Sequence, residues 1–421
     1  MTAPALTTTR TFGADRRAAA SNMADFVKLL QDQKAQTLDL VAPASAITME
    51  DGVLRVAQPD ITTGDLDAPR IYPEGTYRYS VSEVADDGFS TRLLVPREFL
   101  RRTRHGGRSG KTNVAANGQL YDALVNLSLA PQGNKPYLLR LLTGDVLDAE
   151  GRKVADGYIR AFLTNGYRAI DNFDVLVATL EGIRAAGINP ASLQMVGELT
   201  ERKMHVRIHA PEVSVMARDL LENYRSPYRD SETGKYLTGA ECPEIYAGLT
   251  LTNSETGHGS YGLTPQSIIR VCRNGQTWTT DVRREVHQGE RLEEGAVKWS
   301  ASTQAKHLEL IRAKAADTVR HFLSVEYLQE KVDGMREKAG VPIDEEATEA
   351  AVTVVAKECS FTDAEAASVL KDFGFGGDYT VGGMVQAVTS AAQRTADPER
   401  QFAMESATEK VYSLAGVLHR L

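Results

Sequence analysis

Apolar residues near the start of the chain recur first at helical spacing and then in alternation. In the segment SNMADFVKLLQDQKAQ, the residues Met23, Phe26 and Leu30 would lie on one face of a helix. The next segment, DLVAPASAITMEDGVLRVA, predicts two strands around Asp51-Gly52, a pair typical of a tight hairpin turn. Further on, SVSEVADDGFSTRLLVPREFLRRTR is typical of two short helices. We therefore expect a helix, a pair of strands and two more helices before the first Gly-rich loop.

The middle of the chain predicts a sheet whose strands are joined mostly by hairpins. The segments PYLLRLLTG and GYIRAFLT are compact and apolar, and the polar stretch between them is typical of a long hairpin loop. A helix is predicted in AIDNFDVLVATLEGIRAAGINP, with Asp171 or Asn172 as its N-cap and Gly187 and Pro190 at its end. Strand patterns follow in ASLQMVGELTERKMHVRIHAPE and in EIYAGLTLTNSETGHGSYGLTPQSIIRVCRNGQTW. This order favours an α+β fold with a mostly antiparallel sheet and packed helices.

The pattern becomes helical toward the C-terminus. The segment STQAKHLELIRAKAADTVRHFLSVEYLQEKVDGMREK carries an apolar stripe, and SFTDAEAASVLKDFG begins with a capping box from Thr362 to Glu365. We therefore divide the chain into a disordered tail over residues 1–20, an α+β domain over residues 21–300 and a helical C-terminal region over residues 301–421.

Composition and cysteine content narrow the class of protein. The formal net charge of −8 argues against a protein that coats nucleic acid over its whole surface, although it permits one basic face. No apolar run approaches the ~20 residues needed to cross a membrane, and the N-terminus lacks the apolar segment of a secretory signal. Cys242, Cys272 and Cys359 lie far apart, unlike the cysteines of a zinc cluster or disulfide scaffold. We therefore expect a cytoplasmic protein with no membrane contact.

The segment RRTRHGGRSGKT, over residues 101–112, resembles a phosphate-binding loop at its end. The Walker A motif, G-x-x-x-x-G-K-[ST], requires a glycine at the position of His105. The residues before the loop are charged and helical in pattern, whereas the motif follows a buried strand. We therefore expect no NTP hydrolysis. The alternative, a nucleotide-dependent enzyme that uses Lys111, predicts that Lys111→Ala abolishes nucleotide binding.

The same segment is the most basic part of the chain. From Arg97 to Lys111 there are six Lys and Arg residues and one Glu. A charge run is commonly only a solvated surface, but an adaptable, Gly-rich basic loop also suits a phosphate backbone, which requires charge rather than fixed geometry. We predict that this loop is a flexible clamp on nucleic acid, and its candidate residues are Arg102, Arg104, Arg108 and Lys111.

One strand segment, RKMHVRIHA, places cationic residues on one predicted face. Its polar side carries Lys203, His205, Arg207 and His209, while the alternating apolar residues face the other way. The two histidines would lie roughly 13 Å apart at ~3.3 Å per residue, too far to share a metal ion. The segment therefore predicts either a track for phosphates or an ordinary solvated strand face.

A second strand segment mixes aromatic residues with arginine. Tyr158, Arg160 and Phe162 are expected on one face, with Arg140 of the neighbouring strand beside them. Aromatic rings can stack on bases while arginines pair with phosphates. The alternative is a core face in which both arginines are tied to acidic residues. The candidate nucleic-acid-binding residues of the sheet are Arg140, Tyr158, Arg160, Phe162, Lys203, Arg207, Arg270 and Arg273.

No motif indicates catalysis, a cofactor or a metal site. His258, His287 and the serines show no triad signature, and Cys272 alternates with apolar neighbours as a core residue does. We therefore expect a protein that is not an enzyme and that uses neither a cofactor nor a metal.

Several segments resemble a known protein family. GYIRAFLTNGYRAIDNFDVLVATL resembles the pattern RAfLSdrYrplDN followed by a helix, and LTLTNSETGHGSYGLTPQSIIRVCRNG resembles NSHDGs followed by RlVCtNG. With PASAITMEDGVLRV and the closing YTVGGMVQAVTSAAQRTADPERQFAMESATEKVYSLA, these patches resemble the phage/plasmid-like family known as domain of unknown function 932, from about residue 37 to 415.

The resemblance implies a mobile-element protein, and a phage origin first. Genes of this family tend to lie among DNA replication and recombination functions, which is an association rather than a mechanism. Thr164-Asn165-Gly166 replaces Ser-Asp-Arg of the family pattern, and Glu255-Thr256 replaces His-Asp. The basic segment has no counterpart in the pattern, so the resemblance implies nothing about its role.

These observations lead to one main hypothesis and one alternative. We expect a phage or mobile-element protein of DNA metabolism, in the cytoplasm of the host cell, that binds single-stranded DNA and anneals complementary strands during replication or recombination. Annealing proteins commonly form rings or filaments, so we also expect a homo-oligomer, with the C-terminal helices as a contact surface. The alternative is a structural or host-interaction module whose acidic C-terminal helices bind a phage or host protein.

Overall fold

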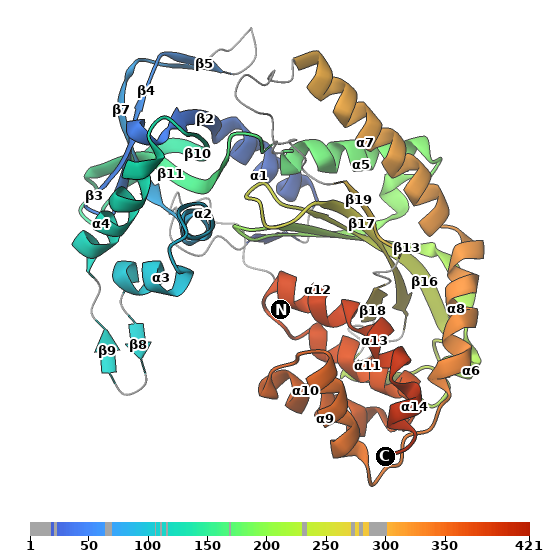
Figure 1. Ribbon diagram of the computed structural model, residues 1–421. Coiled ribbons are helices and arrows are strands. Elements are labelled where there is room, and N and C mark those ends of the chain that lie inside the picture. Colours follow the sequence, from blue (N-terminus) through green and yellow to red (C-terminus); the bar gives the residue numbers. More distant parts are fainter. Residues whose placement is uncertain are drawn as a thin grey trace.

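The computed structural model describes most of the chain. The described residues are 18–20, 23–63, 70–105, 107–109, 112–114, 117–167, 170–229, 234–270, 274–277, 281–285 and 301–421. They form two larger sheets and a group of C-terminal helices, which Figure 1 shows together.

The first sheet has six strands in the order β2-β10-β11-β7-β4-β3. These strands are β2 (Thr37–Pro43), β3 (Ile47–Glu50), β4 (Val53–Gln58), β7 (Gly75–Val81), β10 (Pro136–Leu147) and β11 (Lys153–Thr164). Neighbouring strands are antiparallel except β11 and β7, which are parallel. Asp51 and Gly52 both have positive φ in the turn of the β3–β4 hairpin, which confirms the predicted turn.

Three helices pack on this sheet. They are α2 (Glu83–Leu93), α3 (Arg97–His105) and α4 (Gly118–Leu129). Phe89 and Tyr121 from the helices form one core with Leu139 and Phe162 from the strands. Gly88 allows α2 to approach β11 closely, because a Cβ at this position would lie 3.0 Å from the backbone nitrogen of Phe162.

The second sheet is antiparallel throughout and has seven strands among the described residues. Its order is β1-β12-β13-β16-β17-β18, and β19 also pairs with β17. The strands are β1 (Ala18–Ala20), β12 (Gln194–Leu199), β13 (Met204–Met216), β16 (Glu244–Asn253), β17 (Tyr261–Ile269), β18 (Asn274–Thr277) and β19 (Arg283–Glu285). The predicted disordered tail is therefore wrong at its end, because residues 18–20 pair with β12.

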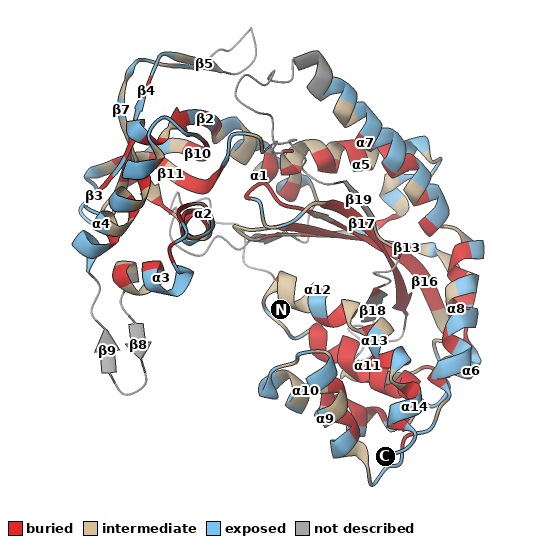
Figure 2. Cartoon of the chain, viewed as in Figure 1, coloured by how far each residue is buried: buried red, intermediate tan, exposed pale blue. Residues whose placement is uncertain are grey.

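Helices cover both faces of the second sheet, as Figures 1 and 2 show. One face packs against α1 (Met23–Gln36), α5 (Asn172–Ala185) and α7 (Ala301–Phe322). Gly182 allows α5 and α7 to touch, because a Cβ there would lie 2.9 Å from the Cβ of Ala315. The α8 helix (Val325–Ala339) then leads along the sheet toward the C-terminal helices.

The opposite face of the second sheet meets the C-terminal helices. They are α9 (Thr348–Glu358), α10 (Asp363–Gly376), α11 (Val381–Ala392), α12 (Pro398–Ser406), α13 (Thr408–Ser413) and α14 (Ala415–Leu418). Every residue of α11 is buried, so this helix forms the centre of the group. The predicted capping box at Thr362 and Glu365 is confirmed at the start of α10.

The remaining elements are short. They are α6 (Arg218–Leu221), the 3₁₀ helices Ala44–Ala46, Ala130–Gln132 and Pro190–Ser192, and the two-stranded pairs β5 (Ile61–Thr63) with β6 (Arg70–Tyr72), β8 (Gly107–Ser109) with β9 (Thr112–Val114), and β14 (Arg225–Arg229) with β15 (Tyr236–Thr238). The predicted α+β class, with a largely antiparallel sheet and a helical C-terminal region, is confirmed.

Candidate functional site

The most basic segment forms a projecting unit, which we call the basic arm and define as α3 with the β8–β9 hairpin. Figure 1 shows the hairpin extending away from the first sheet beyond α3. On α3, the exposed fractions of the Arg101 and Arg102 side chains are 54% and 38%, and both bind the same carboxylate, Glu98. Phe99 of the same helix is 46% exposed. The exposed residues of α3 therefore include an aromatic ring and more cations than anions.

Arg104 has a different role, because it faces inward. It donates to the Asp86 carboxylate at 2.8 Å and to the backbone oxygen of Ser82 at 3.2 Å. Tyr121 of α4 donates to the other oxygen of Asp86 at 2.6 Å. Arg104 thus joins α3 to α2 and α4, and its guanidinium is not presented to solvent. The side chains of two other predicted clamp residues, Arg108 and Lys111, lie outside the described residues.

A buried network of charges lies where the two sheets meet. Arg140 is 1% exposed, and it binds Asp39 at 2.9 Å and also Asp171. Arg160 binds the Glu255 carboxylate at 2.5 Å, and Arg140 lies 3.8 Å from the other oxygen of Glu255. The alternative predicted for these two arginines, a core site in which they are tied to acidic residues, is the arrangement observed.

Glu255 is the centre of this network. Burial alone raises the pKa of its carboxyl group, but the guanidiniums of Arg160 and Arg140 outweigh burial and lower it. The backbone N–H of Asn172 donates to Glu255 at 2.7 Å, and the Gln33 amide donates at 3.1 Å. A buried ion network of this kind fixes geometry, since removal of one partner leaves an unpaired buried charge.

Two of the segments that carry the family resemblance, GYIRAFLTNGYRAIDNFDVLVATL and LTLTNSETGHGSYGLTPQSIIRVCRNG, come together at this network. Arg160 and Asn172 belong to the first segment, and Asn253 and Glu255 belong to the second. The Asn253 amide donates to the Asn172 side chain at 2.8 Å and to the backbone oxygen of Ile170 at 2.9 Å. Sequence reasoning missed Glu255, although a carboxylate inside a polar run that ends a buried strand is a usable signal.

The predicted shared face of Tyr158, Arg160 and Phe162 is wrong. Arg140 of β10 pairs with Ala161, and the next residue pairs with Ile159, so a β-bulge in β11 adds one residue at Arg160. As a result Ile159 and Phe162 both pack into the core under α2, and Arg160 points to Glu255. Phe162 stacks on Tyr137 with ring centroids 4.4 Å apart and is fully buried.

His258 belongs to a second polar cluster near the same junction. Its Nε2 lies 3.0 Å from Asp87 of α2, and its Nδ1 lies 3.0 Å from the Thr256 hydroxyl. This order matches a carboxylate–histidine–hydroxyl triad. However, Asp87 also binds Arg202 at 2.9 Å, as well as Arg97, and Thr256 is 3% exposed.

The cluster therefore has a structural role, because it connects α2 to the loops that contain Arg202 and His258. Burial raises the pKa of Asp87. The hydrogen bonds from His258 and Arg202 and the charges of the arginines outweigh burial, so the pKa lies below its ordinary value. The Thr256 hydroxyl also lies 3.2 Å from the backbone oxygen of Arg202. The closed position of this hydroxyl gives a substrate no access, so we assign it no nucleophilic role.

The polar face of β13 is covered by the C-terminal helices. The sequence predicts it as a solvated face or a phosphate track, but His205 and Arg207 are 1% and 8% exposed. The His205 ring packs near Phe402 of α12, with centroids 5.6 Å apart, and burial, then the charges of Arg207 and Lys203, lower its pKa to about 3. Both predicted environments are wrong, because α12 lies where solvent was expected.

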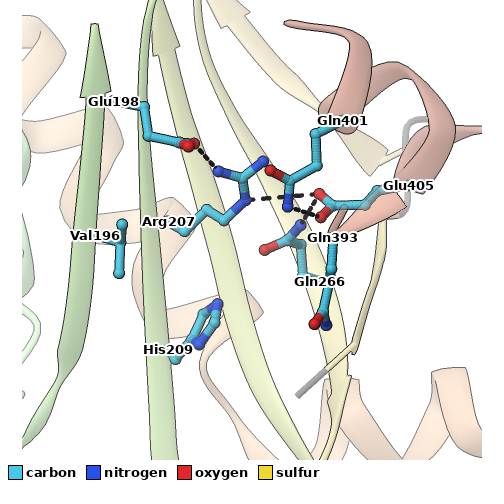
Figure 3. A pocket seen from close by; sticks show the side chains of 8 residues that line it. All are labelled: Val196, Glu198, Arg207, His209, Gln266, Gln393, Gln401 and Glu405. Carbon is cyan, nitrogen blue, oxygen red and sulfur yellow. Dashed lines mark hydrogen bonds and ion pairs between the residues drawn. The ribbon is translucent and has the colours of Figure 1, made fainter. Parts of the chain in front are cut away.

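Arg207 lies between two carboxylates in a small pocket under α12, which Figure 3 shows. It binds Glu198 of β12, and its Nε lies 3.7 Å from Glu405 of α12. Burial raises the pKa of Glu405, although Arg207 opposes the increase. The residues that line the pocket are Val196, Glu198, Arg207, His209, Gln266, Gln393, Gln401 and Glu405.

The remaining candidates do not extend a basic surface. Lys203 lies 3.7 Å from the Glu399 carboxylate. Arg270 binds Glu244 at 2.5 Å and lies over the Tyr246 ring. Tyr158 is half-buried, and Arg273 lies outside the described residues. Among the described residues of the predicted set, Arg140, Arg160 and Arg207 form buried ion pairs, whereas Arg102 lies on the surface of α3.

Neither a family model, nor a curated protein, nor a solved structure matches this chain. In the part of the chain that the structure describes, no group of three or more His, Cys, Asp or Glu side chains could hold a metal ion. Within the same residues, no helix has the length and apolar character needed to cross a membrane.

Proposed function

We propose that the protein binds single-stranded DNA through the basic arm. The observation that supports this proposal is that α3 exposes the Phe99 ring and also Arg101 and Arg102, two arginines that share one glutamate. An aromatic ring stacks on an unpaired base, and the adjacent guanidiniums pair with the flanking phosphates. Duplex DNA offers no free base face at such a site, so stacking favours single strands.

The residues that we propose for DNA binding differ from those predicted from the sequence alone. Arg140, Arg160 and Arg207 now serve the fold, because each is buried against carboxylates. Phe99 and Arg101, which the sequence did not single out, join Arg102 as the binding residues. Arg108 and Lys111 extend the same basic segment in sequence.

Strand annealing and self-association are part of the same proposal. A protein that anneals strands must hold two single strands with their bases accessible, and several copies along a strand achieve this. A phage or mobile-element origin and a location in the host cytoplasm remain predictions from the resemblance.

Fluorescence anisotropy of labelled single-stranded and duplex oligonucleotides at several salt concentrations tests the proposal. Arg101→Gln with Arg102→Gln should lower the slope of log affinity against log salt by about 1.4, since each single-strand phosphate contact contributes about 0.7. Phe99→Ala should cost about 1–3 kcal/mol of single-strand binding and little of duplex binding.

A matched control comes from α7. Arg312 and Arg320 are about as exposed as Arg101, and each also faces one carboxylate. Arg312→Gln with Arg320→Gln should leave the salt slope unchanged. Equal losses in the two double variants, or no binding by the folded wild type at low salt, would contradict the proposal. Lys111→Ala tests the NTPase alternative, because it should abolish nucleotide binding only if that alternative holds.

A protein partner for the C-terminal helices is the second candidate. The segment before α9 and the first turn of this helix expose the acidic residues Asp344, Glu345, Glu346 and Glu349. Such a surface suits a basic protein rather than DNA. Failure of DNA binding with a folded protein directs the search to this surface.

A further inference from the structure

The pocket under α12 is lined on one side by residues of the second sheet. The pairing of β12, β13, β16 and β17 places Gln194, His209, Gly248 and Gln266 in one row across the sheet. Gly248 has no side chain, and the Cδ1 atom of Ile268 occupies the space above it. A Cβ at Gly248 would collide with the Cδ1 atom of Ile268. The pocket lies between His209 and Gln266 of the sheet and Gln401 and Glu405 of α12, and its volume is about 260 Å³.

Two deeply buried side chains present unpaired polar atoms to this pocket. Gln266 is 2% exposed, and its amide nitrogen donates to Thr277 at 3.0 Å and to Glu405 at 3.3 Å. Its amide oxygen has no hydrogen-bond partner among the described residues, and neither has the Nη2 of Arg207. Buried polar atoms without partners are costly, so a hydrogen-bond acceptor and a donor here favour a ligand that offers the complementary pair.

The charge of the pocket limits the class of ligand. Glu198 and Glu405 face a single cation, Arg207, so the lining carries no excess positive charge. A phosphate or carboxylate is therefore disfavoured. The flat imidazole of His209 and the apolar Val196 form part of the lining, as Figure 3 shows, which suits a planar ring rather than a sugar.

We propose that this pocket binds the guanine base. Guanine presents a carbonyl oxygen that accepts from the Arg207 guanidinium, and arginine is the side chain that most commonly reads this atom. The ring N–H and amino group beside that carbonyl donate to the Gln266 amide oxygen and to a glutamate carboxylate. Adenine has no carbonyl at this edge and only one donor group, and cytosine has no second donor beside its amino group.

Isothermal titration calorimetry with the full-length protein tests the site with guanosine, adenosine, cytidine and inorganic phosphate as probes. Guanosine should bind at least about tenfold more tightly than adenosine or cytidine. Gln266→Met removes the unpaired acceptor at similar volume and should weaken guanosine binding by about tenfold. Gln329→Met, on the exposed side of α8, is the matched control and should not change it.

Each contrary outcome is decisive. Equal affinity for the three nucleosides, binding of phosphate, or no nucleoside binding by the folded protein overturns the proposal, and in the last case ordered water satisfies the two atoms. If thermal unfolding shows that Gln266→Met is misfolded, Val196→Trp narrows the pocket from its exposed side and should abolish guanosine binding. Retained binding in that folded variant also overturns the proposal.

The source of the base is a separate question that the same reagents answer. If the ligand is free guanosine, a dG-containing oligonucleotide should not compete with it. If the ligand is a base within a strand, this oligonucleotide competes and poly(dT) does not. This site is independent of the basic arm: Phe99→Ala should leave guanosine binding intact, and Gln266→Met should leave poly(dT) binding intact.

Discussion

The two faces of the seven-stranded sheet are both buried, but they are built from opposite chemistry. Toward α5 and α7 the sheet presents Val206, Ile208, Leu249 and Leu251, which are fully buried aliphatic side chains. Toward α12 the same strands present histidine, arginine, threonine and glutamine, among them Arg207. Alternation of apolar and polar residues along a strand therefore indicates that the two faces of the sheet meet different environments. It does not indicate that one of these environments is solvent.

The difference has an energetic consequence. The apolar face is held by burial and close packing, so any loss of volume is costly. The polar face is held by pairing, so its stability depends on the partners of each charge.

Removal of the cation from the polar face should have the largest effect. Arg207→Met leaves the buried Glu405 and its neighbour Glu198 without their counter-charge. We expect the free energy of unfolding to fall by about 3–5 kcal/mol, measured by urea denaturation near pH 7. Combining Arg207→Met with Glu198→Gln and Glu405→Gln should recover part of the loss. A loss below about 1 kcal/mol in the single variant would contradict the conclusion that charge pairing stabilises the polar face.

Truncation on the apolar face should follow. Leu249→Ala removes fully buried methyl groups between the sheet and its helices. We expect a loss of about 3 kcal/mol in the same assay, since the cavity adds to the lost burial. Leu310→Ala, at an exposed position of α7, is the control and should change stability by less than about 0.5 kcal/mol.

Low pH should destabilise the protein through a histidine on the polar face. His205 is buried and neutral, with its pKa lowered from 6.5 to about 3. Below pH 6.5 the unfolded chain binds a proton here that the folded protein does not, so stability falls as pH decreases toward 3. The slope from this one group reaches about 1.4 kcal/mol per pH unit.

The matching measurement compares urea unfolding from pH 7 to pH 4. His205→Leu should flatten the dependence on pH, because it removes the group that titrates only in the unfolded chain. His419→Leu, with its side chain exposed near the C-terminus, should not. An unchanged slope in His205→Leu indicates that the ring is protonated in the folded protein.

The smallest effect should come from a hydroxyl. Thr250 is fully buried on the polar face, and its Oγ1 has no hydrogen-bond partner among the described residues. Thr250→Val keeps the shape and removes an unsatisfied group, so stability should stay within about 1 kcal/mol of wild type or increase. Thermal and urea unfolding should agree on the sign. A loss above about 2 kcal/mol shows that the hydroxyl is paired, by ordered water for example.

Local structure was predictable from the sequence wherever a local rule decided it. The Asp51-Gly52 turn and the capping box at Thr362 depend on residues a few positions apart, and both are observed. The environment of Arg207 was not predictable, because the helix that covers it comes from a distant part of the chain. The bulge at Arg160 also left no sign, since one extra residue in a strand does not alter its composition.

The candidate site shows the same division. The sequence pointed to the basic arm through its charge run, and the structure adds which side chains face outward. The sequence pattern also placed Arg140 and Arg160 side by side. Their partners Asp39 and Glu255, however, lie far from them in the chain. Ion pairs between distant residues follow from the fold and not from spacing.

The cover of the polar face also has a consequence for synthesis on the ribosome. The Thr200 hydroxyl donates to Glu399 of α12, a contact that spans 199 residues. The apolar face has α5 available before its strands emerge, whereas the polar face must wait until almost the whole chain has been made. A hydrophilic surface tolerates that delay without attracting other nascent chains. The polarity of each face thus matches how long it stays open during translation.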